Sequence, residues 1–340
     1  MQNNRLRIGI IGLKNQGKEH LLTAELLEHS EIVAVCDANV HELNRVQKSH
    51  PEIERYISIE EILKDPKVDA FVLALPHHVY PEYWERIVSC GKPLLKEKPL
   101  GRSLPEAFYF VQTARKYECY LQTAIQRRTH PSYLYLRNLL KGRELQSVSV
   151  VMHLGFDPER DDAGWRMDAQ KAGGGVVLDY GYHGIDLLFF LLGKVELISA
   201  TLWRGGRPAT CECLESEARL VLRSGTTWIH VDLMIGGEPD SSRSSGFKKM
   251  EKITVDCDWG RITADRCGVQ LGENILFECE RDWSQSMVTQ LENFARNVMG
   301  QRFDQDCVWE QIPAMRVIEQ IYTEAGFLWP LGKYEQILSS

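Results

Sequence analysis

The sequence predicts an α/β domain built on a parallel, doubly wound sheet, followed by an α+β domain with a large, mostly antiparallel, open-faced sheet. Three observations lead to this expectation. The first third of the chain alternates short, continuous apolar runs with helical periods, which is typical of parallel strands buried on both faces. The remainder contains runs that alternate apolar and polar residues, which indicates strands with one exposed face. The chain has 340 residues, a length more usual for two domains than for one.

The first domain is predicted to span residues 1–125, because consecutive strand–helix–strand units follow one another there. Its strands are expected, in order, at 7–13, 31–37, 71–76 and 93–97, and its helices at 17–29, 81–90 and 105–117.

The second domain is predicted to span residues 126–340. Its strands are expected at 147–156, 195–203, 217–222, 226–235, 252–255 and 260–264, and its helices at 182–192, 286–299 and 308–327. Strands grouped in this way favour an antiparallel sheet over further strand–helix–strand units. The polar stretch GGEPDSSRSSG, residues 236–246, is expected to be a loop at the end of a hairpin.

The charge balance argues against some classes of partner. The chain carries 40 basic and 47 acidic residues, a net charge of −7, whereas a protein that binds nucleic acid or a membrane surface usually presents a basic face. No apolar run approaches the roughly 18 residues of a membrane span, and the first strand begins too early to leave room for a signal peptide. We expect a cytoplasmic protein with no nucleic-acid or membrane partner.

The nine cysteines indicate free thiols. Their odd number and irregular spacing are typical of a protein in a reducing compartment. Cys211 and Cys213 form a C-x-C pair, but no second pair or histidine cluster accompanies them. No metal site is therefore predicted.

A glycine-rich segment, GIIGLKNQG at residues 9–17, joins the first strand to the first helix. Gly12 and Gly17 occupy the first and third places of the dinucleotide fingerprint G-x-G-x-x-G, whose glycines let the backbone approach a pyrophosphate. Lys14 occupies the middle place, where its side chain must swing aside and its ammonium could pair with a phosphate. On the glycines alone, a plain tight turn is almost as well supported as a cofactor site.

Asp37 favours the cofactor site. It ends the second strand at a position where a carboxylate can bind both hydroxyls of an adenosine ribose and would repel a 2′-phosphate. We therefore predict NAD(H) in preference to NADP(H). The alternative is that Asp37 caps the helix that starts at Asn39. Pro76 and His77 are expected near the cofactor, because ligands bind at the carboxyl ends of parallel strands.

Three residues are candidates for catalysis. Lys98 lies in KEKP, where Pro99 favours an extended backbone and ends the strand, although such a lysine is usually a solvated loop residue. Asp179 and His183 are four residues apart at the expected start of an apolar helix, so they share one face. A helix N-terminus disfavours a charged imidazole, which would leave His183 neutral and available as a base. The alternative is that Asp179 only caps the helix and His183 packs in the core.

Taken together, these motifs resemble those of the glucose–fructose oxidoreductase/inositol dehydrogenase/MocA (Gfo/Idh/MocA) superfamily. The similarity covers nearly the whole chain: GIIGLKNQGKEHL, the strand that ends at Asp37, EKP at 97–99, QRR at 126–128 and AGGGVVLDYGYHGID at 172–186. The resemblance implies an N-terminal Rossmann domain and a C-terminal α/β domain over an open sheet. It also puts Lys98, Asp179 and His183 in the family's catalytic places. Lys14 departs from the family's usual glycine.

The activity that this resemblance implies is hydride transfer between nicotinamide and a secondary alcohol or ketone of a sugar, inositol or sugar derivative. The predicted cofactor-binding residues are Gly12, Lys14, Gln16, Gly17, Asp37, Pro76, His77, Glu97 and Lys98. The substrate-binding candidates are Arg127, Arg128, Trp165, Arg166, Tyr180 and Tyr182. For each of these, a structural ion pair or a core contact is an equal alternative.

Other functions stay open on the sequence. One is a non-catalytic sugar- or cofactor-sensing protein, which Lys14 makes plausible. Others are an NAD-dependent glycosidase of the same superfamily and a reductase of another substrate class. Because a large antiparallel sheet with an uncovered face usually needs a partner, and because the family commonly pairs such faces, we expect a homodimer or homotetramer.

Overall fold

The computed structural model describes residues 5–155, 164–210, 212–236, 248–280, 283–300 and 308–327. The chain divides into two compact units. The first comprises residues 1–101, 106–129 and 283–311, and the second comprises residues 102–105, 130–282 and 312–340.

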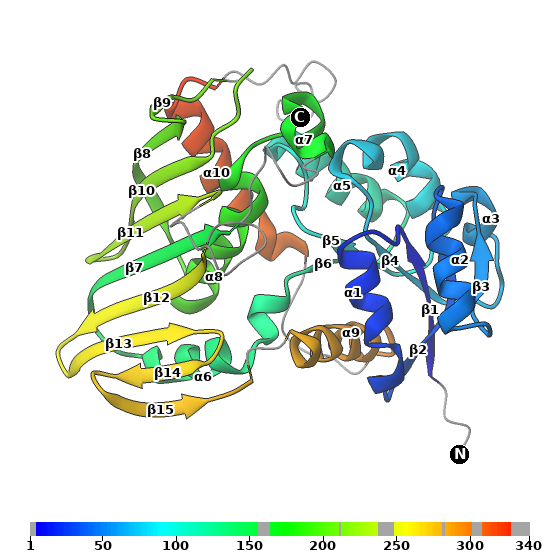
Figure 1. The fold of residues 1–340 in the computed structure, drawn as a ribbon, viewed down its shortest axis with the longest axis horizontal. Coiled ribbons are helices and arrows are strands. Elements are labelled where there is room, and N and C mark those ends of the chain that lie inside the picture. Colours follow the sequence, from blue (N-terminus) through cyan, green and yellow to red (C-terminus); the bar gives the residue numbers. More distant parts are fainter. Residues whose placement is uncertain are drawn as a thin grey trace. The chain divides into compact units, whose positions relative to one another are not determined.

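The first unit is built on a six-stranded sheet in the order β3-β2-β1-β4-β5-β6, with every pair of neighbours parallel (Figure 1). The strands are β1 (Leu6–Ile11), β2 (Ser30–Cys36), β3 (Glu54–Tyr56), β4 (Ala70–Leu73), β5 (Leu94–Glu97) and β6 (Leu121–Ala124). The helices between them are α1 (Gln16–Leu22), α2 (Val40–Ser49), α3 (Ile59–Leu63), α4 (Tyr80–Ser89) and α5 (Leu104–Lys116). The predicted doubly wound α/β class is confirmed. The strand order reverses between β1 and β4, the place where such sheets bind ligands.

A helix from far along the chain completes the first unit. α9 (Ser284–Val298) was expected within a continuous second domain of residues 126–340, but Leu291, Phe294 and Ala295 pack into the core that β1 and β2 form with α1 and α2. The predicted domain division therefore differs from the structure at this helix. The amphipathic pattern of α9 predicts a buried face but not the sheet against which that face packs.

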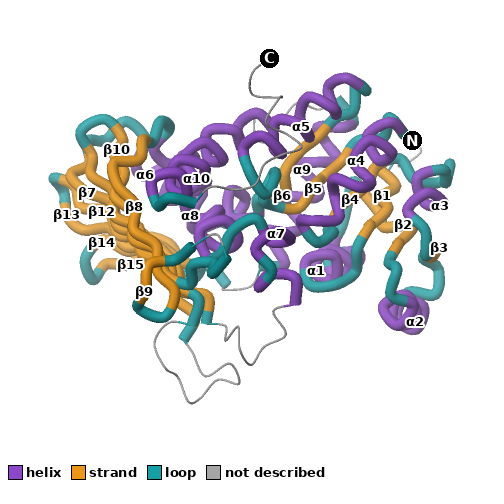
Figure 2. The backbone as a smooth tube through the Cα atoms, turned by 90° about the horizontal axis from the view of Figure 1, so that it is seen from above, coloured by secondary structure: helices purple, strands orange, loops and turns teal. Residues whose placement is uncertain are grey.

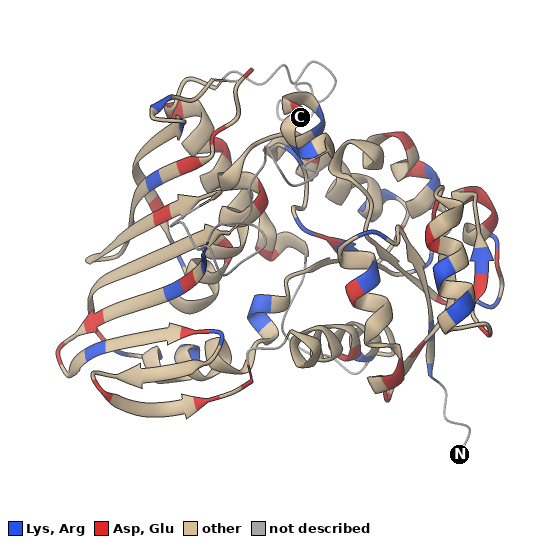
Figure 3. Ribbon diagram, viewed as in Figure 1, with Lys and Arg blue, Asp and Glu red and all other residues tan. Residues whose placement is uncertain are grey.

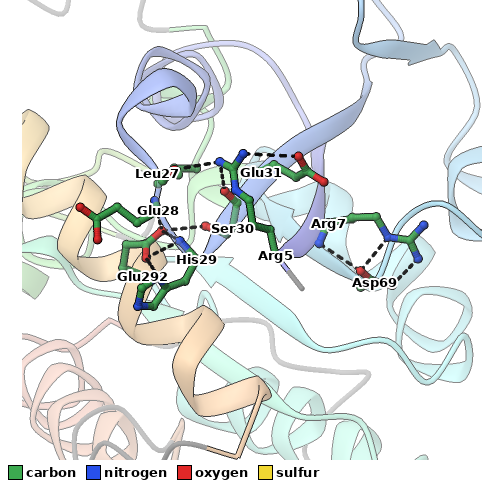
Figure 4. Close-up of polar contacts among 9 residues, drawn as sticks. All are labelled: Arg5, Arg7, Leu27, Glu28, His29, Ser30, Glu31, Asp69 and Glu292. Atoms are coloured by element: carbon green, nitrogen blue, oxygen red, sulfur yellow. Dashed lines mark hydrogen bonds and ion pairs between the residues drawn. The ribbon is translucent and has the colours of Figure 1, made fainter. Parts of the chain in front are cut away.

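A buried carboxylate ties α9 to the start of β2. Glu292 accepts hydrogen bonds from the backbone N–H groups of Glu28 and His29 and from the hydroxyl of Ser30, at 2.9–3.2 Å (Figure 4). These groups immediately precede or begin β2, and the carboxylate satisfies donors that the sheet leaves unpaired. α9 is thus held by both apolar packing and directed hydrogen bonds.

The second unit is built on a nine-stranded sheet in the order β15-β14-β13-β12-β7-β11-β10-β8-β9. The strands are β7 (Leu145–Leu154), β8 (Glu196–Arg204), β9 (Arg207–Pro208), β10 (Glu217–Ser224), β11 (Thr227–Met234), β12 (Lys249–Cys257), β13 (Gly260–Asp265), β14 (Gly268–Leu271) and β15 (Asn274–Glu278). Among the described strands of this sheet, only β7 and β11 pair in parallel, so the predicted mostly antiparallel sheet is confirmed. The hairpin β14–β15 was not predicted, and residues 237–246 of the predicted polar loop lie outside the described residues.

Helices cover one face of this sheet. They are α6 (Pro131–Leu140), α8 (Tyr182–Leu192) and α10 (Ile312–Glu324), and they lie on the same side of the strands in Figure 2. A short helix, α7 (Ala169–Ala172), precedes α8. Among the described residues of this unit, no helix lies on the opposite face (Figure 2).

One stretch of the second unit, Ala169–Leu192, has the length and hydropathy of a membrane-crossing helix. Of its most apolar window, 78% is buried inside the structure. The stretch is also not one straight helix, because Gly173 ends α7 in the left-handed conformation with φ of 81°. The burial is typical of a core segment of a folded domain.

Candidate active site

The glycine loop follows β1 and requires glycine at both predicted places. Gly12 has φ of 94°, and a Cβ atom there would lie 2.5 Å from the carbonyl oxygen of Ala74, beyond the end of β4. A Cβ atom on Gly17 would lie 1.8 Å from the carbonyl oxygen of Gly12. No side chain fits at either distance, so the loop folds back tightly and leaves a backbone-lined surface at the end of β1.

Lys14, in the middle place of the fingerprint, is exposed. Its carbonyl oxygen accepts a hydrogen bond of 3.1 Å from the Gly17 N–H, so its backbone takes part in the turn while its side chain lies toward solvent. The next residue, Asn15, has φ of 43°, an uncommon conformation for a residue with a side chain. The loop thus accommodates a lysine where the fingerprint has glycine.

We expect Lys14→Gly to leave the fold intact and to change NAD(H) affinity by no more than about tenfold. Removing the side chain relieves crowding at the pyrophosphate of a bound cofactor but also removes a phosphate partner, and the two effects oppose each other. Fluorescence titration of NADH measures the change. A thousandfold loss of affinity would show that Lys14 is a principal phosphate ligand.

Asp37 lies against the glycine loop. Its Oδ2 accepts a hydrogen bond of 2.7 Å from the Leu13 N–H, and its Oδ1 accepts one of 2.8 Å from the Asn39 N–H. α2 is capped by the Asn39 side chain, which accepts from the His41 N–H, so the capping role considered for Asp37 belongs mainly to Asn39. Each oxygen of a carboxylate can accept a further hydrogen bond. Asp37 is therefore held at the loop and retains capacity to bind ribose hydroxyls.

The other predicted cofactor residues lie at the ends of elements of the same unit. Gln16 begins α1. Pro76 and His77 lie just beyond β4, where His77 starts a short 3-10 helix and is largely buried. These positions belong to the carboxyl edge of the parallel sheet, where a dinucleotide is expected.

The EKP motif is anchored by a buried pair. β5 ends at Glu97, whose Oε1 lies 2.8 Å from Nε2 of His20 on α1. Both side chains are buried, which ties the end of β5 to α1. Lys98 follows at once and is half-buried. Glu97 is thus placed to fix the strand end that presents Lys98, a relation that the sequence motif alone did not reveal.

In the second unit, Asp179 and His183 lie in one continuous helical segment. Asp179 lies in a π-helical turn, Val177–Gly181, and His183 lies in the first turn of α8. The helical segment therefore begins earlier than predicted, and Asp179 is inside it rather than capping α8. Single π-helical turns often occur at functional sites, because they widen the helix locally.

The surroundings of this pair were not predicted. Asp179 Oδ2 accepts a hydrogen bond of 3.0 Å from Nε of Arg166, which keeps a positive charge beside the carboxylate. The His183 side chain is only 4% exposed, and its ring meets that of Tyr180 edge-on at 6.4 Å between centroids. The imidazole is therefore enclosed by neighbouring side chains rather than exposed to solvent.

A buried glutamate explains the glycines that precede the pair. Glu215 Oε1 accepts hydrogen bonds from the N–H groups of Gly175 and Val177 and from the hydroxyl of Tyr322, at 2.8–3.0 Å. A Cβ atom on Gly175 would lie 2.1 Å from the Glu215 carbonyl oxygen. Burial raises the pKa of Glu215. This cluster fixes the start of the helical segment that bears Asp179, and no sequence signal marked Glu215 for that role.

The predicted substrate residues have mixed surroundings. Arg127 and Arg128 are 3% and 4% exposed, with Arg127 over the ring of Trp283 and Arg128 paired with Glu310 at 2.6 Å. These contacts match the structural alternative for both arginines.

The remaining candidates lie in the second unit. Arg166 stacks over the ring of Trp165 at 4.6 Å and pairs with Asp179, so it lies beside a catalytic candidate. Tyr180 donates a hydrogen bond of 3.1 Å to Glu251 and is 5% exposed. Tyr182 has no exposed surface, which favours a core contact over the predicted substrate contact.

Comparison with known families agrees with this geometry. A domain described as the NAD-binding Rossmann fold of an oxidoreductase family matches residues 6–125, and the Gfo/Idh/MocA C-terminal domain matches residues 133–259. The parallel sheet, the glycine loop and Asp37 accordingly define a protein of the class of oxidoreductases with an NAD-binding Rossmann domain. Within that class, the chain belongs to the Gfo/Idh/MocA family, as the resemblance of its motifs predicts.

Individual relatives are distant. The myo-inositol 2-dehydrogenase of Thermotoga maritima is 23% identical over 313 residues, which are 86% of this chain and 88% of that protein. Matches to several other curated relatives span about half of their length, 53% to 58%.

Solved structures share the fold over nearly the whole chain. GenD2 from gentamicin A biosynthesis, in complex with NAD, is similar with a TM-score of 0.77 and 19% identity, over 95% of both chains. KijD10, a 3-ketoreductase from Actinomadura kijaniata in complex with TDP-benzene and NADP, has a TM-score of 0.74 and 17% identity, over 94% of this chain and 98% of that one.

Proposed function

We propose that this protein is an NAD(H)-dependent oxidoreductase that transfers a hydride between nicotinamide and a secondary alcohol or ketone of a sugar, an inositol or a sugar derivative. The observation that carries this proposal is the hydrogen bond between Asp37 and the glycine loop, in a chain that also retains Lys98, Asp179 and His183. The Thermotoga maritima relative is named for an inositol and KijD10 for a ketone, which supports this substrate class.

The backbone-lined glycine loop and the carboxylate beside it fit a dinucleotide. Gly12 and Gly17 would admit the pyrophosphate, and Asp37 would bind the adenosine ribose. When bound, the cofactor supplies the hydride acceptor or donor, and the protein supplies orientation and proton handling.

Proton handling falls to side chains of this chain. In oxidation, His183 would accept the proton of the substrate hydroxyl at a ring nitrogen, and in reduction it would return that proton. The carboxylate of Asp179, which is paired with the guanidinium of Arg166, would fix the orientation of the His183 imidazole. Lys98 would donate a hydrogen bond to the substrate oxygen and stabilise the alkoxide charge that develops there.

We expect tighter binding of NAD(H) than of NADP(H), because Asp37 would meet the 2′-hydroxyl of the ribose. A charge-assisted hydrogen bond is worth roughly 1.5–3 kcal/mol, or about 10- to 150-fold in affinity. Fluorescence titration of both cofactors tests this expectation, with Asp37→Asn as the matched variant, in which the preference should shrink. Equal or tighter NADPH binding by the unaltered protein would show that Asp37 does not recognise the ribose.

A substrate panel tests the reaction itself. Inositols, sugars, sugar phosphates and amino sugars are offered with NAD⁺, and the absorbance of NADH is followed. Net accumulation of NADH is the expected result. Hydrolysis of a glycoside without net NADH would favour the glycosidase alternative, and ligand binding without turnover would favour the sensing alternative.

The open face of the nine-stranded sheet supports a homodimer or homotetramer. Trp228 on β11 is 46% exposed although its neighbours Thr227 and Ile229 are buried, so an aromatic side chain lies on the face that no described helix covers. Covering such a face usually requires a partner. Size-exclusion chromatography should give at least twice the monomer mass of 39.0 kDa, and a monomeric peak would contradict this expectation.

The charge distribution supports a small-molecule substrate rather than a nucleic acid or a membrane. Figure 3 shows acidic and basic residues interspersed along the elements of both units, in keeping with the net charge of −7. A cytoplasmic location is also part of the proposal. The cysteines among the described residues are free thiols, which supports a reducing compartment; Cys211 and Cys307 lie outside those residues.

A further inference from the structure

The first unit buries a lysine that the proposed mechanism does not use. Lys96 lies within β5 of the parallel sheet, between Leu73 on β4 and Thr123 on β6, and is 1% exposed. The preceding strand residues, Leu94 and Leu95, are apolar, as is usual for a strand buried on both faces. A fully buried lysine at such a position is rare unless its ammonium is paired.

The Lys96 ammonium donates to two backbone carbonyls, and the buried carboxylates of Glu106 and Glu97 also attract its charge. Its Nζ donates hydrogen bonds to the carbonyl oxygens of Glu97, at 3.1 Å, and Pro99, at 2.7 Å. It also lies over the ring of Tyr80, 4.0 Å from the centroid. Burial lowers the pKa of Lys96 to about 7. Charged or neutral, the amine keeps at least the two N–H donors that these carbonyls need.

The two carbonyls lie on either side of Lys98. One belongs to the residue before it and the other to the residue after it, so a single side chain fixes the backbone at both ends of the Lys98 residue. The direction in which the Lys98 side chain leaves the backbone follows from that geometry. Small errors in the position of a group that contacts a reacting atom cost large factors in rate.

From this arrangement we propose that Lys96 is a positioning residue for Lys98. The inference rests on the proposed function, in which Lys98 acts on the substrate oxygen. Burying an ammonium costs more than burying an apolar side chain of similar volume, and the attraction of Glu106 and Glu97 offsets only part of that cost, since the pKa of Lys96 is still lowered. Its presence is explained by the two carbonyls at the turn, which a leucine would leave without these donors.

Lys96→Met tests the proposal, because methionine fills a similar volume without a donor. The matched control is Lys92→Met. Lys92 Nζ also donates to a backbone carbonyl, that of Asp65 at 2.7 Å, and also lies over an aromatic ring, but just before the start of β5. We expect Lys96→Met to lower kcat roughly 10- to 100-fold with KM for NAD⁺ within about twofold, and Lys92→Met to change neither. Loss of kcat and NAD⁺ affinity together in both variants would indicate a purely structural role and overturn the inference.

A double-mutant cycle shows whether Lys96 acts through Lys98. If it does, Lys96→Met combined with Lys98→Met should be no slower than Lys98→Met alone, within about twofold. Losses that multiply would mean that the two lysines act independently, and the inference would be wrong.

Hydrogen exchange separates this inference from the proposed function. Lys96→Met should speed exchange of the backbone amides just after β5, and Lys92→Met should not. Unchanged exchange would refute the positioning role whatever the activity. Faster exchange together with a fully active Lys98→Met variant would instead show that Lys96 holds the turn while the proposed role of Lys98 is wrong.

Discussion

His183→Ala is expected to lower kcat by roughly 10²–10⁴, the usual contribution of a positioned proton-transfer group. NAD(H) affinity should stay nearly unchanged, because His183 lies in the second unit and the glycine loop and Asp37 lie in the first. The measurement is a single-turnover rate at saturating cofactor, with cofactor affinity from fluorescence titration. A rate within a factor of three of the unaltered protein would mean that His183 is only a packed helix residue.

Because His183 is buried, a second variant separates chemistry from packing. His183→Gln retains a polar side chain that can hydrogen-bond but cannot take up a proton near neutral pH. Its rate should be as low as that of His183→Ala. If the glutamine variant recovers activity, packing rather than proton transfer is the property that matters.

Lys98→Met is expected to lower kcat at least as far as His183→Ala does, because the developing alkoxide loses a charged hydrogen-bond donor. Removing one such donor from an oxyanion site usually costs about 10²–10³ in kcat. Steady-state rates with the best substrate of the panel measure the loss. Lys98→Arg, which keeps a positive charge in a different shape, should retain more activity than Lys98→Met. Equal activity of Lys98→Met and the unaltered protein would remove Lys98 from the mechanism.

The sequence alone was sufficient for features that local patterns encode. Continuous apolar runs between helical periods predicted the parallel sheet, because its strands are buried on both faces. Runs that alternate apolar and polar residues predicted the antiparallel sheet, because its strands are buried on one face only. The roles of Gly12 and Gly17 were also predictable from the fingerprint spacing. The structure shows the physical reason, because neither place in the loop admits a Cβ atom. The spacing of Asp179 and His183 placed them correctly in one helical segment.

The tertiary structure decided what depends on partners distant in the chain. α9 completes the first unit because its apolar face and Glu292 meet β1 and β2, and an amphipathic pattern does not state which sheet it will cover. Glu215 and the Arg166–Asp179 pair likewise gain their roles only through residues that folding brings near.

Lys96 is the clearest case. In the sequence it is one more charged residue beside a strand end, whereas in the fold it is buried with its Nζ on the two carbonyls that flank Lys98. A charged residue in a sequence usually predicts a surface position. Only the folded structure shows that hydrogen bonds offset the desolvation cost of burying the Lys96 ammonium.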